Sequence, residues 1–146
     1  MKSSQRITRI QLAINDEDEF VMLGIVSTDP DYKLSLSINK KLHISLKTTS
    51  PVEFRDDTGS ELIFSRFSDS VGAPDLIFNL VSNRLGKNFL LKKLKNIDFI
   101  FQLYDPDRIY NINQLAALLR EIDTVTAVFN LDLKVLKDKN LKYVLH

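Results

Sequence analysis

Two sets of side chains alternate along the stretch around residue 100. Apolar side chains occupy every second position, and these are Ile97, Phe99, Phe101 and Leu103. The positions between them hold Asp98, Ile100, Gln102 and Tyr104. Because successive side chains of a β-strand point to opposite faces, the first set forms one apolar face that has to be buried. The pattern therefore predicts a strand over 97–104 around which the other elements gather.

Shorter apolar runs predict further strands before and after this one. We expect strands over 7–14, 20–27, 43–46, 52–54, 61–67, 76–81 and 124–131, the last with Val125, Ala127, Phe129 and Leu131 on one face. The run 20–27 is apolar at almost every position, which is typical of a strand buried on both faces, and Gly24 inside it indicates a bulge or a close backbone approach. Short turns separate the strands between 52 and 81, which favours an antiparallel meander.

Two segments carry the signals of a helix start. Asp29 would cap, and Pro30 would begin, a helix that ends near Leu42, although the alternation within that segment also fits a strand. Asn111 and Gln114 have the form of a capping box, and apolar residues follow at helical spacing. The patterns predict one α+β domain over 1–146, with a single antiparallel sheet of about six to eight strands and two or three helices packed on it.

Composition narrows the classes of function. The chain has 146 residues, of which 44% are hydrophobic and 27% are charged, as expected for a globular domain. Its net charge of +1 creates no strong field for nucleic acid or an acidic membrane. The absence of cysteine excludes disulfides, thiolate zinc sites and cysteine nucleophiles. No apolar run is long enough to span a bilayer, so we expect a cytoplasmic protein without membrane contact.

Histidines and paired carboxylates give little support for catalysis or metal binding. The two histidines are His43, for which we expect a structural or solvent-facing role, and His146 at the end of the chain. The carboxylate pairs are Asp29/Asp31, Asp56/Asp57 and Asp105/Asp107, and each flanks a Pro or Gly at a predicted turn. Asp is favoured at turns for its local hydrogen bonds, so these pairs need no metal to explain them. We therefore expect no metal and no cofactor.

Asp98 is the strongest single candidate for a site residue. It lies on the second face of the predicted strand, where a covered carboxylate would need backbone donors or a cation. The favoured interpretation is structural, with Asp98 tying down the connection 84–96 or a helix amide. The alternative is a carboxylate that contacts a ligand.

The segment before Asp98 is strongly basic. It contains Arg84, Lys87, Lys92, Lys93 and Lys95 and no acidic residue. With Phe89 among these cations, the segment could contact phosphates and stack on a base. These five cations and Asp98 are the candidate binding residues.

The same stretch resembles a known family. Residues 91–99, which include Ile97-Asp98-Phe99, resemble the signature of the IPExxxVDY family of small bacterial proteins. Lys92 and Lys93 stand in the places of the Pro and Glu of that signature. Segments 23–27, 31–34, 39–42, 127–132 and 136–141 also resemble the family, in the same order along the chain. The resemblance supports the helix after Pro30 and implies no known activity.

Three hypotheses on function follow. The first is a non-enzymatic protein-interaction domain that binds a partner protein or a second copy of itself. The second is a nucleic-acid-binding module that uses the basic segment 84–95. The third is an enzyme with a carboxylate-based site near Asp98.

Overall fold

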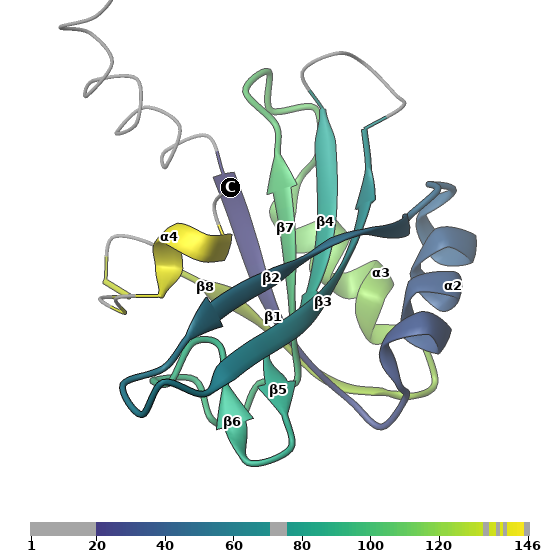
Figure 1. The fold of residues 1–146 in the computed structure, drawn as a ribbon. Coiled ribbons are helices and arrows are strands. Elements are labelled where there is room, and N and C mark those ends of the chain that lie inside the picture. Colours follow the sequence, from purple (N-terminus) through teal and green to yellow (C-terminus); the bar gives the residue numbers. More distant parts are fainter. Residues whose placement is uncertain (1–19, 71–75, 133–134, 137, 139, 145–146) are drawn as a thin grey trace, which may run out of the picture.

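The computed structural model describes residues 20–70, 76–132, 135–136, 138 and 140–144. Its main feature is a six-stranded antiparallel sheet with the strand order β2-β3-β4-β7-β1-β8, joined by a small two-stranded sheet of β5 and β6 (Figure 1). The strands are β1 (Phe20–Ser27), β2 (Lys47–Arg55), β3 (Glu61–Asp69), β4 (Ile77–Ser82), β5 (Arg84–Leu85), β6 (Asn88–Phe89), β7 (Phe99–Tyr104) and β8 (Val125–Leu131). The helices are α2 (Asp31–Leu42), α3 (Ile112–Arg120) and the short α4 (Leu141–Val144). The predicted α+β class is confirmed.

Strand β7 lies in the middle of the sheet and contributes to two apolar clusters. Phe99, Phe101 and Leu103 pack with residues of α2 and α3 on one face. Ile100 packs on the other face, which is covered by residues of the connection 83–98 and by α4. The alternation predicted around residue 100 is therefore confirmed from Phe99 onward, and both faces of the strand are buried.

Strand β1 is buried on both faces, as predicted, because Leu23 and Ile25 pack in the cluster with α2 and α3 and Met22 packs in the cluster on the other face. Its two edges pair with β7 and β8. Gly24 lies where the side chain of Ile97 packs against β1. A Cβ atom at Gly24 would lie 2.8 Å from Cδ1 of Ile97, so the glycine provides the space for that side chain. Ile97 thus packs across β1 and not within β7, where the sequence pattern placed it. The predicted strand over 7–14 lies outside the described residues.

The prediction of a strand over 43–46 followed by a loop is wrong. His43 has a left-handed backbone conformation with φ of 58°, which ends α2. Strand β2 begins only at Lys47 and continues past Pro51, where the register shifts between Thr49 and Val52. β2 is an edge strand, so the missing N–H of proline costs no bond of the sheet there.

Two further details correct the sequence analysis. Asp29 does not cap α2, since Pro30 is the N-cap residue and no side chain caps the helix. The register of β8 shifts opposite Val26 and Ser27, so Val125 and Val128 both reach the cluster covered by α2 and α3. The prediction that Val125, Ala127, Phe129 and Leu131 share one face of β8 is therefore wrong. A register shift moves the side chains that follow it to the other face of the strand.

The predicted cap of α3 is confirmed. The backbone N–H of Gln114 donates to Oδ1 of Asn111 at 3.1 Å. Asn111→Ala is expected to lower the free energy of unfolding by about 1 kcal/mol, because the first turn of α3 loses its acceptor. Amide hydrogen exchange over Leu115–Leu119 should become faster. Exchange rates identical to those of the unchanged protein would contradict this role of Asn111.

Candidate functional site

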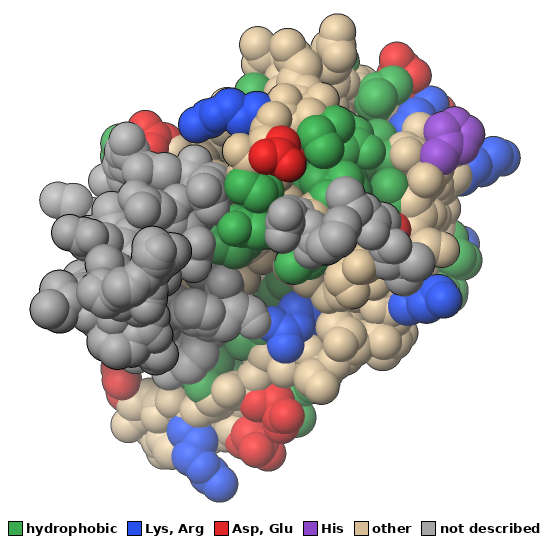
Figure 2. Space-filling view, turned by 90° about the horizontal axis from the view of Figure 1, so that it is seen from above, with side chains coloured by type: hydrophobic (Ala, Val, Ile, Leu, Met, Phe, Trp, Pro, Cys, Tyr) green, Lys and Arg blue, Asp and Glu red, His purple; other side chains and the backbone are tan. Residues whose placement is uncertain are grey.

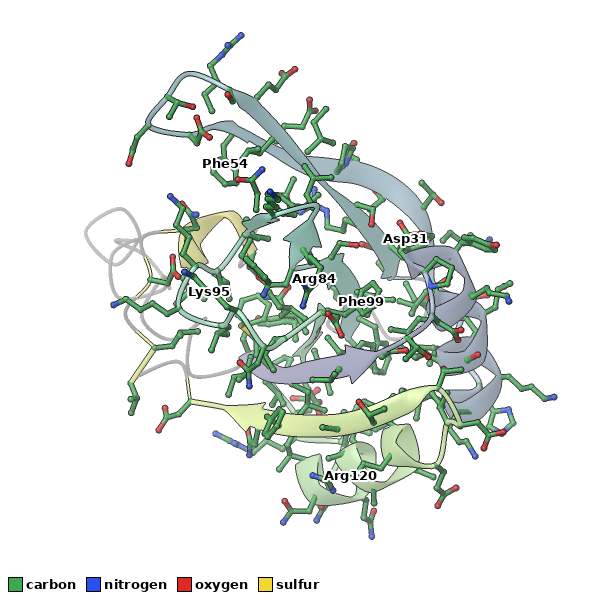
Figure 3. All side chains as sticks on the ribbon, turned by 90° about the horizontal axis from the view of Figure 1, so that it is seen from below. Asp31, Phe54, Arg84, Lys95, Phe99 and Arg120 are labelled. Carbon is green, nitrogen blue, oxygen red and sulfur yellow. The ribbon has the colours of Figure 1, made fainter. Side chains whose placement is uncertain are left out.

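An open cavity of about 390 Å³ lies at one end of the sheet, beside the start of α2. Its walls come from segments far apart in the sequence: the end of β1, the start of α2, the first half of β3, the end of β4, β5, and the start of β7. Seen from below, Arg84 and Phe99 lie near each other, and Asp31 lies on the α2 side of them (Figure 3). We call this space the Arg84 cavity.

Pairing between strands places two serines in the Arg84 cavity. Ser82 of β4 is the register partner of Phe99 in β7. On its other side, the hydroxyls of Ser82 and Ser65 share a hydrogen bond of 2.6 Å across β4 and β3. The lining therefore combines a pair of hydroxyls with the largely buried Phe99 ring. Polar atoms in a partly apolar cavity can orient a bound group.

Arg84 and Asp98 form an ion pair in the wall of this cavity. Nε of Arg84 donates to Oδ1 of Asp98 at 3.0 Å, and the backbone N–H of Ser27 donates to Oδ2 at 3.1 Å. The Arg84 side chain is 48% exposed, whereas that of Asp98 is 19% exposed. Asp98 thus holds the guanidinium in place, and the Nη groups of Arg84 have no hydrogen bond to a described residue.

Two more carboxylates come from the segment between β1 and α2. Asp29 accepts a hydrogen bond at Oδ2 from the hydroxyl of Thr124, at 2.8 Å. Asp31 accepts one at Oδ1 from the backbone N–H of Tyr32, at 2.7 Å. Both residues are half-buried and line the Arg84 cavity. The start of α2 favours negative charge at this position because of the helix dipole.

Exposed apolar side chains from two strands border the cavity. Ile63 of β3 is 44% exposed and Leu85 of β5 is 40% exposed, and both line the Arg84 cavity. The two strands contact each other although they belong to different sheets. Apolar surface beside fixed charges is typical of a site that binds another molecule.

Asn83 is fully buried, and it positions the connection that carries Arg84. Its Nδ2 donates to the backbone oxygens of Leu94 and Ile97, each at 2.9 Å, and its Oδ1 accepts from the backbone N–H of Leu91 at 2.8 Å. The backbone of Asn83 also bonds to Leu90 and Asp98. Asn83 was not predicted as a site residue. The only feature of the sequence that marks it is a polar residue that follows an apolar strand.

The candidate residues predicted from the sequence are only partly brought together. Arg84 and Asp98 form one pair, as described above. The side chains of Lys87, Lys92, Lys93 and Lys95 are exposed on the connection outside the lining of the Arg84 cavity. The favoured interpretation of Asp98 is supported in part, because it holds Arg84 of the connection, but its backbone donor belongs to strand β1 and not to a helix.

Two interactions within the chain make side chains of the basic segment less available to a nucleic acid. The guanidinium of Arg84 covers the ring of Phe89, with Cζ 4.9 Å from the ring centroid. Lys92 lies near the turn at Asp56. The pKa of Asp56 is lowered mainly by the hydrogen bond that the Thr58 hydroxyl donates, and Lys92 contributes electrostatically to this shift. The Phe89 ring of the segment is therefore already covered on one face by Arg84, and Lys92 interacts electrostatically with a carboxylate of the chain.

His43 and Asp105 lie outside the Arg84 cavity. His43 is exposed at the end of α2 and is purple in the view from above (Figure 2), which agrees with the predicted solvent-facing role. Asp105 accepts bonds from the backbone N–H groups of Ile109 and Tyr110, as expected for a turn. Among the described residues, no group of three or more acidic or histidine side chains could hold a metal ion.

No protein-family model, no curated protein and no solved structure matches the chain. The resemblance to the IPExxxVDY family stays a prediction. No helix in the described part of the chain is long and apolar enough to cross a membrane.

Proposed function

We propose that this chain is a non-enzymatic protein-interaction domain and that the Arg84 cavity binds a segment of a partner protein. The observation that carries the proposal is the lining of the cavity, in which exposed Ile63 and Leu85 lie close to the Arg84–Asp98 pair. Apolar side chains of a partner would gain from burial on the two aliphatic residues, and the fixed polar groups would select among partners.

The geometry of Arg84 supports this interpretation over the two alternatives. A nucleic-acid module would use the basic segment 84–95, but Asp98 offsets the charge of Arg84, and Arg84 covers the ring of Phe89. A carboxylate-based enzyme would use Asp98, but both oxygens of that side chain accept hydrogen bonds from within the chain. The Nη groups of Arg84 face no described acceptor, so they suit the carbonyl oxygens of a bound segment.

Selection of peptides from a displayed random library on the folded protein tests the proposal. We expect enriched peptides whose affinity falls at least tenfold when Ile63→Ser and Leu85→Ser are combined. The two side chains are partly exposed, so the fold should tolerate the change.

The matched control combines Leu36→Ser and Ile109→Ser, which removes two exposed apolar side chains outside the Arg84 cavity. Peptide affinity should stay unchanged in this control. Equal losses in both variants, or no enriched peptide at all, would contradict a binding role for the cavity.

A further inference from the structure

Asp29 and Asp31 in the Arg84 cavity form no ion pair with a described residue. The cation that lines the cavity is Arg84, and it pairs with Asp98. Oδ2 of Asp29 and Oδ1 of Asp31 each accept one neutral donor from within the chain. The second oxygen of each carboxylate, Oδ1 of Asp29 and Oδ2 of Asp31, has no hydrogen bond to a described residue.

The cavity therefore carries an excess of negative charge. Its lining contains the carboxylates of Asp29, Asp31 and Asp98 and the single guanidinium of Arg84. The pairing of Arg84 with Asp98 leaves two carboxylates without a counter-charge. Charge complementarity then favours a cationic group in the bound partner over an anionic one.

We infer that the Arg84 cavity takes a lysine or arginine side chain of a partner protein between Asp29 and Asp31. An apolar side chain next to it in the partner packs on Ile63 and Leu85. This inference rests on the proposed function, because it specifies the chemistry of the partner segment. The cavity volume of about 390 Å³ suits one or two side chains of the partner.

A bare metal ion fits the same carboxylates less well than a basic side chain. Calcium takes about six to eight oxygen ligands at about 2.3–2.6 Å, which requires several acids to converge on one point. No such group of three or more acidic or histidine side chains occurs among the described residues. A lysine or arginine carries its donors on a long stem, so it can reach separated carboxylates beside an apolar surface.

Titration with small probes, followed by NMR, tests the inference without knowledge of the partner. The probes are Nα-acetyl-lysine methylamide and, as the anionic counterpart, Nα-acetyl-glutamate methylamide. We expect saturable shifts of the Asp29, Asp31 and Tyr32 amide signals with the basic probe only. The affinity should fall as salt is raised, since exposed ion pairs are screened.

The decisive variant combines Asp29→Asn and Asp31→Asn. Each asparagine keeps a carbonyl oxygen for Thr124 or for the Tyr32 amide, so the local hydrogen bonds remain while both charges disappear. The variant should abolish the shifts caused by the basic probe. It should weaken basic cavity-dependent peptides by roughly twofold to thirtyfold, the effect of two exposed ion pairs.

The charge-matched control combines Asp107→Asn and Asp123→Asn, which are exposed and lie outside the Arg84 cavity. It should leave the probe and the peptides unaffected. Cavity-dependent peptides without lysine or arginine would overturn this inference and leave the proposed function intact. Equal shifts with both probes, or no shift with the basic probe, would also overturn the inference. Failure of the Ile63/Leu85 variant to weaken any peptide would instead count against the proposed function.

Discussion

Phe101→Ala is expected to lower the free energy of unfolding by about 3–5 kcal/mol, the usual cost of removing a buried aromatic side chain. Phe101 is 1% exposed and lies in β7 between the partner strands β4 and β1. Its ring stacks on Phe78 with the centroids 5.8 Å apart. The substitution leaves a cavity beneath α2 and α3 that the surrounding side chains fill only in part.

Denaturant unfolding of the variant measures this loss as a shift of the midpoint with little change in slope. Phe129→Ala is the matched control, because Phe129 is 44% exposed and lies on the edge strand β8. It should cost much less than Phe101→Ala. Equal midpoints for the two variants would contradict the central place of β7 in the core.

Asn83→Ala is expected to cost about 3 kcal/mol, because three hydrogen bonds of one buried side chain disappear, and the backbone oxygen of Ile97 and the N–H of Leu91 lose their partner. The same change should loosen the connection that carries Arg84. We therefore also expect weaker binding at the Arg84 cavity, even under conditions in which the variant remains folded.

Asn96→Ala provides the control for Asn83→Ala, since Asn96 is exposed on the same connection. Its unfolding midpoint should stay within experimental error of that of the unchanged protein. Amide exchange at Leu91 separates the two variants further, because the Leu91 N–H donates to the side-chain Oδ1 of Asn83, whereas the Leu90 N–H donates to the Asn83 backbone oxygen and keeps its bond. Unchanged exchange there in Asn83→Ala would contradict the anchoring role.

Local sequence signals predicted the elements that depend on neighbouring residues. The alternation from Phe99 to Leu103 and the Asn111 cap both involve contacts or spacing within a few residues, and the structure confirms both. The start of β2 could not be predicted in this way. It depends on the left-handed conformation of His43 and on the register shift near Pro51, and neither follows from the hydrophobic pattern.

The sequence likewise identifies some residues of the candidate site but not how they are brought together. Arg84 and Asp98 stand out in the sequence because of their charge, but their pairing requires the chain to turn back through β5 and β6. Ser65 and Ser82 carry no signal of their own, and they meet only because β3 and β4 are neighbours in the sheet. The arrangement of a site from distant strands depends on strand order, which local patterns do not specify.

The position of β1 in the sheet affects how the chain folds during synthesis. Strands β2, β3 and β4 pair with one another in the order of the sequence, so these two pairings close over short loops. β1 leaves the ribosome earlier, but its partners are β7 and β8, and Gly24 pairs with Ile100 and Phe129. Closing such long loops is slow. The apolar strand β1 therefore has two unpaired edges until β7 and β8 have been synthesised, and unpaired strand edges favour aggregation of the nascent protein.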